Sequence, residues 1–244
     1  MRRPLKSESL RVLSEMGIPI GGVIDIGVLS GTPELMNAFR DKKHLLVEPV
    51  QEHHETIHKL YSKYGIDYEL VNCAASDTNG QMNLRVTSVE KGKDITHAHL
   101  TTNEGHEKTR VVPVQTVEQI LQEHPLPGPY YLKIDVDGAE AAILKGAQGM
   151  LSACSVIEIE TGMTSFFERA KLVLEAGFEL FDIVDPCYYK GRLAEVDLIF
   201  VNKIIAREHG VDLSLGSFNV VDLFQGAIDI SKWAPYRKGT DTTV

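Results

Sequence analysis

The sequence has few cysteines, no basic excess and no long apolar run, and each of these absences excludes a class of protein. Cys73, Cys154 and Cys187 are too few and too far apart for a disulfide framework or a CxxC metal or redox site. The 25 Lys and Arg residues against 34 Asp and Glu residues give a net charge of −9, which disfavours nucleic acid as a partner. No segment reaches the roughly 18 apolar residues that span a bilayer, and no apolar run follows the charged N-terminus. We therefore expect a cytoplasmic protein that binds neither nucleic acid nor membrane.

The alternation of patterns along the chain indicates an α/β fold. With 244 residues, of which 43% are hydrophobic, the chain can bury a sizeable core. Short apolar runs alternate with segments of helical periodicity, which predicts a seven-stranded, mostly parallel sheet with helices on both faces. The predicted strands are GGVIDIG, HLLVEP, YELVNCAAS, YYLKIDVDG, CSVIEIE, FELFDIVD and VDLIFVNK.

We interpret residues 1–244 as a single domain with three segments outside the regular alternation. Residues 1–21 have the spacing of an N-terminal helix, and residues 22–203 form the core. Within the core, residues 82–114 hold two alternating segments around a polar middle, which predicts a β-hairpin or flap inserted after the third strand. Residues 204–244 have weak periodicity and are compatible with a docking tail, a dimer contact or a loose terminus. A homo-oligomer is therefore one of the alternatives.

The first predicted strand ends in a turn that is suited to a ligand. The stretch VIDIGVLSG, residues 23–31, runs an apolar strand into Asp25 and then places Gly27 and Gly31 in the following turn. In doubly wound sheets ligands bind at such turns, where glycine permits a sharp bend and close approach to the backbone. Glu48, at the end of the second strand, is placed to accept hydrogen bonds from the two hydroxyls of a ribose. An adenosine-type cofactor is predicted.

The turn does not match the fingerprint of a dinucleotide site. It has the form D-x-G-x-x-x-G and lacks the middle glycine of G-x-G-x-x-G, which argues against NAD. An acid before the first glycine suits a cofactor with positive charge, such as S-adenosylmethionine. The alternative is a glycine turn that serves only packing.

The fourth predicted strand carries the most specific motif. YLKIDVDGAEAAILKGA, residues 131–147, together with VIDIGVLSG and VNCAASD, resembles the FkbM family of S-adenosylmethionine-dependent methyltransferases over roughly residues 22–203. The resemblance implies a class I methyltransferase (Rossmann-like) sheet with an antiparallel last strand and a β-rich insert after strand three. It also implies transfer of a methyl group to a hydroxyl oxygen of a small molecule or sugar.

The resemblance carries the cofactor contacts of the family onto positions of this sequence. The first cofactor motif corresponds to Asp25, Gly27 and Gly31, and the ribose-binding acid corresponds to Glu48. The stretch that borders the adenine corresponds to Ala75, Ser76 and Asp77.

The resemblance also places the end of the fourth strand beside the transferable methyl group. Asp135, with Asp137, Gly138 and Glu140 in the same motif, occupies this position. An alcohol needs a base, and Asp135 and Asp137 are the candidates, with Lys133 as a third group that pairs with Asp135 or borders the core. The alternative is that Asp135 only orients the cofactor and that Asp137 caps the helix beginning near Gly138.

The first loop departs from the pattern of the family. Val28 and Leu29 stand where the family commonly has the small and polar residues of G-A-N-x-G. This change either reshapes the methionine pocket or marks a non-catalytic binding or scaffold protein.

Acids and histidines near the predicted strand ends raise the question of a metal. Glu158 and Glu160 end the fifth strand, and with Asp135 they offer oxygen ligands for a cation such as Mg²⁺. A divalent metal is not favoured, since acids at strand ends are often solvated.

The remaining histidines are interpreted as solvated. His97 and His99 share a face if they lie on a strand, and His106 follows them in the insert, so that metal binding or base catalysis is the alternative for this group. His54 and His58 share one face of the helix beside strand two, and we expect both at the surface.

Together these observations predict an S-adenosylmethionine-dependent O-methyltransferase that acts on a small hydroxylated substrate by in-line methyl transfer. Methylation at nitrogen or at carboxylate is the alternative of the same class. A non-catalytic methyltransferase-like protein is the alternative of another class.

Overall fold

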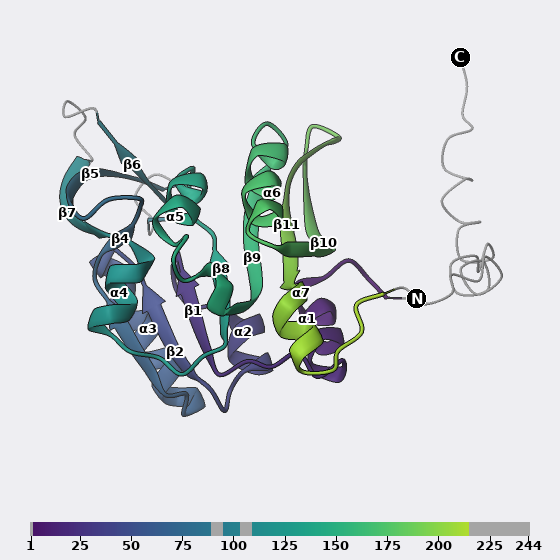
Figure 1. The fold of residues 1–244 in the computed structure, drawn as a ribbon. Helices are drawn as coiled ribbons and strands as arrows, with labels where there is room; N and C mark the ends of the chain where they lie inside the picture. The colour runs from purple at the N-terminus through teal and green to yellow at the C-terminus, as the bar shows by residue number, and fades with distance from the viewer. Residues whose placement is uncertain (1, 89–94, 103–108, 215–244) are drawn as a thin grey trace, which may run out of the picture. The chain divides into compact units, whose positions relative to one another are not determined.

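The computed structural model describes residues 2–88, 95–102 and 109–214 (Figure 1). The chain divides into one unit of residues 4–211 and a second unit of residues 1–3 with 212–244. All helices and strands below belong to the first unit. His106 and most of the segment 204–244 lie outside the described residues.

A seven-stranded mixed sheet forms the centre of the unit. Its order is β10-β11-β9-β8-β1-β2-β3, and β11 runs antiparallel to both of its neighbours. The pairs β1–β2, β2–β3, β1–β8 and β8–β9 are parallel, so the chain starts near the middle and the strand order reverses at β1. This reversal places a ligand site at the carboxyl ends of β1 and β8. The strands are β1 (Gly22–Ile26), β2 (Lys43–Val47), β3 (Tyr68–Val71), β8 (Tyr130–Ile134), β9 (Cys154–Gly162), β10 (Phe178–Tyr189) and β11 (Arg192–Asn202).

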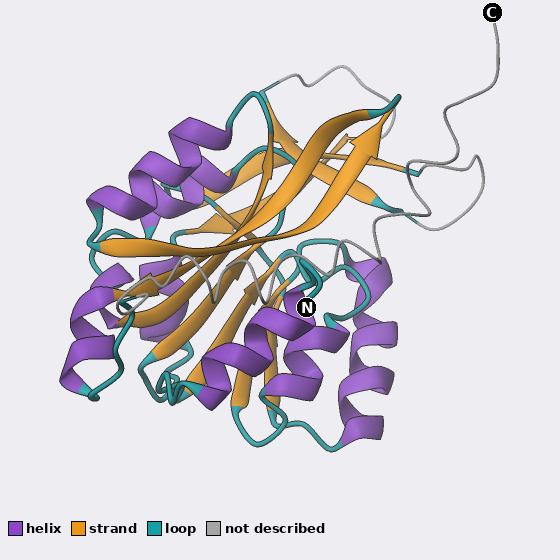
Figure 2. Ribbon diagram, turned by 90° about the vertical axis from the view of Figure 1, so that its right-hand side faces the viewer, coloured by secondary structure: helices purple, strands orange, loops and turns teal. Residues whose placement is uncertain are grey.

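Helices cover both faces of this sheet (Figure 2). One face packs against α4 (Val117–Glu123), α5 (Glu140–Gly146) and α6 (Phe166–Glu175), whose buried apolar residues form one cluster with those of the strands. The other face packs against α1 (Lys6–Glu15), α2 (Pro33–Ala38) and α3 (Gln51–Tyr64). The remaining helices are η1 (Leu151–Ala153) and α7 (Lys203–Glu208). The helix α7 was not predicted, because the segment that follows the last strand has weak periodicity.

The face toward α1, α2 and α3 carries charged groups inside the sheet. Asp25 on β1, Lys133 on β8 and Glu158 on β9 are all almost fully buried. They occupy neighbouring register positions, since Asp25 pairs with Lys133 and Lys133 with Glu158. Buried charges are stable only when paired, so this row must be an ionic network.

The segment after β3 forms a sheet of its own with the order β4-β7-β5-β6. The predicted third strand is divided, because β3 ends at Val71 and Ala74–Ala75 pairs instead with β7. The sequence predicted two strands in this insert, whereas the structure adds β6 between them along the chain. These strands are β4 (Ala74–Ala75), β5 (Gly80–Thr87), β6 (His97–Thr101) and β7 (Thr109–Gln115). Among the described residues, no helix is long and apolar enough to cross a bilayer.

Candidate active site

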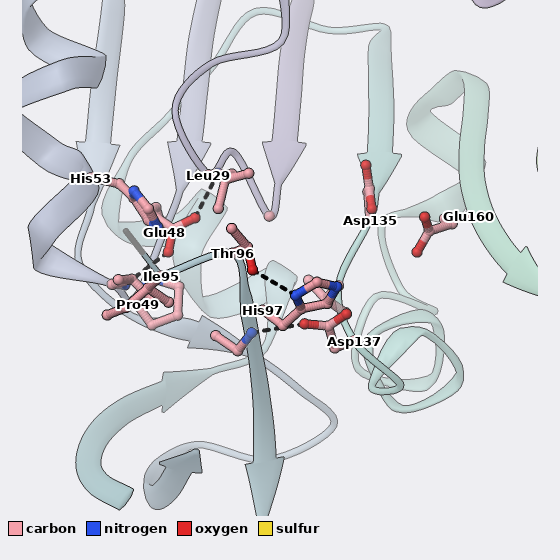
Figure 3. A pocket seen from close by; sticks show the side chains of 14 residues that line it. Leu29, Glu48, Pro49, His53, Ile95, Thr96, His97, Asp135, Asp137 and Glu160 are labelled. Atoms are coloured by element: carbon pink, nitrogen blue, oxygen red, sulfur yellow. Dashed lines mark hydrogen bonds between the residues drawn. The ribbon is translucent and has the colours of Figure 1, made fainter. Parts of the chain in front are cut away.

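A pocket lies at the carboxyl ends of β1, β2, β8 and β9, and β6 of the insert forms its opposite wall (Figure 3). Its cavity volume is about 220 Å³. The lining comes from four parts of the chain: Gly27 and Leu29; Glu48, Pro49, Val50 and His53; Asp135, Val136, Asp137 and Glu160; and Ile95, Thr96, His97 and Ala98. The insert therefore lies over the carboxyl edge of the sheet.

Gly27 allows the first loop to approach the end of β8. Its φ is +83°, and a β-carbon built on it would lie 1.8 Å from the backbone oxygen of Asp135. No other residue fits this place without moving the backbone. Gly31, with φ of +128°, does not line the pocket, and its β-carbon would lie 2.5 Å from Leu60 Cδ2. Packing thus explains Gly31, whereas Gly27 both packs against β8 and lines the pocket.

Glu48 is buried at the edge of the pocket and holds the first loop. Its Oε2 accepts a hydrogen bond from the Leu29 backbone N–H at 2.8 Å, and its Oε1 accepts one from Val50 N–H at 2.8 Å. Burial raises the pKa of Glu48 to about 7, although both backbone donors act against the rise. Leu29 has φ of +54°, an uncommon conformation for a residue with a side chain, and its side chain is partly exposed.

Lys133 lies behind the pocket rather than in its lining. Its Nζ lies 3.2 Å from Asp25 Oδ1 and 3.1 Å from Asp135 Oδ2, and it donates to the Gly27 carbonyl at 3.2 Å. Asp25 also accepts a hydrogen bond from Thr32 Oγ1 at 2.7 Å and is fully buried. Burial alone would lower the pKa of Lys133, but the two carboxylates outweigh it and raise that pKa. The geometry gives Lys133 and Asp25 a role in holding the loop and Asp135, and neither reaches the pocket surface.

Asp135 and Glu160 are neighbours at the ends of β8 and β9 (Figure 3). Burial disfavours the Asp135 carboxylate, but the Lys133 ammonium outweighs it and lowers the pKa of Asp135. Burial, and then the Asp135 carboxylate, raise the pKa of Glu160 to about 8. At neutral pH, Glu160 is therefore mostly protonated and lies beside the ionised Asp135.

The glutamate of the KIDVDGAE motif serves the framework of the site. Glu140 is buried, and its Oε2 lies 2.5 Å from Arg169 Nη2 of α6. The same guanidinium donates through Nη1 to the backbone carbonyl of Glu160 at 2.8 Å. This arrangement ties α5 and α6 to the end of β9 and fixes the place of Glu160.

Asp137 connects the core to the insert. One of its oxygens accepts a hydrogen bond from the backbone N–H of Ala98 on β6 at 2.7 Å. The helix-capping alternative is wrong, because α5 begins at Glu140 and its N-cap is Ala139, which has no side-chain cap. Asp137 thus lines the pocket and also holds β6 over it.

The sequence of the chain matches the family model described as the methyltransferase FkbM domain over residues 23–182. The chain belongs to the FkbM methyltransferase family. This finding confirms the resemblance seen in the sequence. No match was found among curated protein sequences.

A solved structure shows the fold of this chain. A methyltransferase FkbM from Methylobacillus flagellatus is 15% identical, with a TM-score of 0.51, over 74% of this chain and 43% of that chain. An rRNA methylase from Streptococcus thermophilus is 10% identical, with a TM-score of 0.48, over 83% of this chain and 98% of that one. The chain thus spans less than half the length of the M. flagellatus protein. The fold is a class I methyltransferase-like α/β fold.

A second, mostly apolar pocket with a cavity volume of about 30 Å³ adjoins the first. Of the three residues expected to border an adenine, Ala75 lines this pocket, whereas Ser76 and Asp77 line neither pocket. The Ser76 carbonyl lies against Gly146, where a β-carbon would be 2.2 Å from it. Ser76 therefore contributes to packing between the insert and α5.

The three acids considered as metal ligands do not come together. Glu158 is buried with Lys6 of α1, whose Nζ lies 2.7 Å from its Oε1, and it accepts a hydrogen bond from Tyr131. Only Asp135 and Glu160 face the pocket. Within the described residues, no group of three or more His, Cys, Asp or Glu side chains is placed to hold a metal.

The expectation of solvated histidines is confirmed for His58 and His97, which are exposed, whereas His54 and His99 are half-buried. His97 of β6 lines the first pocket and His99 lines the second. His53, in the first turn of α3, is buried and lines the first pocket, although sequence patterns singled out its neighbours His54 and His58. Its place directly after the Glu48 strand end was the signal available in the sequence.

Proposed function

We propose that this chain catalyses S-adenosylmethionine-dependent transfer of a methyl group to a hydroxyl oxygen of a small molecule or sugar. The observation that carries the proposal is that Glu48 and Asp135, from the ends of two different strands, line one pocket. Membership of the FkbM family supports the methyltransferase part of this proposal.

The residues present fit the cofactor. Glu48 offers carboxylate oxygens to the ribose hydroxyls at the end of β2, and Gly27 lines the same pocket. Ala75 lines the small apolar pocket next to it, on the side where we propose that the adenine ring lies. Leu29 does not fill the site, since the pocket is present beside it. This observation favours the enzyme over a scaffold that has lost its cofactor.

The reaction makes modest demands on the protein. When bound, S-adenosylmethionine supplies an activated methyl group. The chain must then hold the acceptor in line, exclude water and take up the proton of the hydroxyl. The insert helps to exclude water, because Asp137 holds β6 over the pocket.

Calorimetric titration with S-adenosylhomocysteine tests the cofactor site. We expect binding by the unchanged protein and binding about tenfold or more weaker for Glu48→Gln, which corresponds to about 1.4 kcal/mol. Glu55→Gln is the matched control, since Glu55 is exposed on α3 and pairs only with Lys59 among the described contacts. Absence of binding at millimolar ligand would overturn the proposal. Loss of turnover in a folded Asp135→Asn variant would separate the enzyme from the scaffold alternative.

A further inference from the structure

The two acids at the reacting end of the pocket have different partners. Asp135 is committed to an ion pair with Lys133 at 3.1 Å. Within the described residues, the Glu160 side chain makes no ion pair, and it lies beside Asp135 in the lining of the pocket. A carboxylate stabilised by an ammonium is a weak proton acceptor, so the acid without that partner is better suited to the task.

We propose that Glu160 is the catalytic base that accepts the proton of the acceptor hydroxyl, while Asp135 orients Glu160 and the acceptor. This assignment rests on the function proposed above. It places the base at the end of β9 rather than in the β8 motif that the sequence singled out.

The groups around Glu160 favour its protonated form until a cation binds in the pocket. Acidic groups face it from three elements: Asp135 after β8, Glu140 on α5, and Glu195 and Asp197 on β11. The Arg169 guanidinium of α6 is directed to the Glu140 carboxylate and to the backbone carbonyl of Glu160, not to its side chain. Asp197 has its own partner in Lys6 at 3.3 Å.

A base works best when its pKa lies near the working pH. The pKa of about 8 for Glu160 meets this condition, whereas the lowered pKa of Asp135 does not. The positive sulfonium of the cofactor, in a site lined by both acids, favours the ionised form of Glu160.

Methyl transfer in this proposal involves only the acceptor hydroxyl, the cofactor and Glu160. The hydroxyl oxygen forms a bond to the methyl carbon as the carbon–sulfur bond breaks, and that electron pair remains on sulfur. The hydroxyl proton moves to the Glu160 carboxylate, and the products are the methyl ether, the neutral thioether cofactor and the protonated acid.

Proton release on ligand binding tests the assignment without an acceptor. S-adenosylmethionine and S-adenosylhomocysteine would each be titrated calorimetrically near pH 8, once in phosphate and once in Tris. These buffers have different heats of ionisation, so the difference in binding heat between them measures the number of protons released. We expect S-adenosylmethionine to release roughly half a proton more than S-adenosylhomocysteine, because Glu160 is about half protonated at its pKa. The excess should vanish in Glu160→Gln and persist in Glu179→Gln, an exposed acid near the opposite end of the same sheet.

The outcomes separate the two proposals. Equal proton release by both ligands, or an excess that survives in Glu160→Gln, would overturn the assignment of the base while leaving the cofactor site intact. Binding of neither ligand would overturn the proposed function and the assignment with it. If Glu160→Gln does not fold, Glu48→Gln decides, because with the other titrating acid of the pocket removed its affinity ratio for the two ligands must still rise with pH up to about 8 and then level off.

Discussion

The buried acid of the first pocket predicts a specific dependence of stability on pH. Glu48 has a pKa of about 7 in the folded protein, compared with its ordinary value of 4.5. A group whose pKa is raised by folding stabilises the folded state fully below the unfolded pKa. This contribution is lost as the pH rises through the folded pKa. Glu48→Gln removes the titration, since an amide does not ionise in this range.

The magnitude follows from the separation of the two pKa values. Each pH unit between 4.5 and about 7 corresponds to about 1.4 kcal/mol, so the full effect is about 3 kcal/mol. In Glu48→Gln an NH₂ group also replaces one of the two acceptor oxygens, so the backbone N–H of either Leu29 or Val50 loses its hydrogen-bond acceptor. That loss shifts the stability of Glu48→Gln by a constant amount and does not alter the dependence on pH.

Urea denaturation followed by circular dichroism from pH 4 to pH 8.5 measures this effect. We expect the stability of the unchanged protein relative to Glu48→Gln to fall by about 3 kcal/mol across this range. Glu55→Gln should run parallel to the unchanged protein. If the stability of the unchanged protein relative to Glu48→Gln stayed constant or rose with pH, this would refute the reasoning that burial raises the pKa of Glu48.

Two further substitutions test the loop and the ion network. Lys133→Met should lower the free energy of unfolding by about 3–5 kcal/mol, because the fully buried Asp25 loses its counter-charge, and urea denaturation measures it. A loss below about 1 kcal/mol would show that Asp25 does not depend on Lys133. Leu29→Asn should stabilise the protein by roughly 0.5–1 kcal/mol, since Asn tolerates the φ of +54° better, whereas Leu29→Ala should not. Thermal unfolding of both variants decides this point, and equal effects would exclude backbone conformation as the cause.

The sequence could predict which strand ends carry the chemistry. The runs that form β1, β2 and β8 are apolar and have acids at or next to their carboxyl ends. In doubly wound sheets these strand ends lie at the same edge of the sheet. Gly27, Glu48 and Asp135 accordingly meet at one pocket. The central strands could be located because they are buried on both faces, which leaves a continuous apolar signal.

The partners of the charged residues could not be predicted in the same way. Glu158 and Glu160 look equivalent in the sequence, two residues apart on one strand. In the structure, Lys6 from the first helix reaches Glu158 and draws it into the core. No local pattern encodes a contact across so much of the chain. β6 was missed although HAHLT alternates polar and apolar residues, because the run is only five residues long and becomes a strand by pairing with β5.

The distribution of two lysines explains the acid chemistry of the whole site. Lys133 pairs with Asp135, and Lys6 pairs with Glu158. Glu48 is buried and Glu160 is half-buried beside the same pocket, and neither has an ion-paired ammonium of its own among the described residues. Their pKa values rise to about 7 and about 8. Both acids are more easily ionised when a cation enters the pocket. Binding of a cationic cofactor should therefore strengthen as the pH rises through this range, whereas binding of its neutral product should change less. Product release would then be favoured by the same electrostatics that favour cofactor capture.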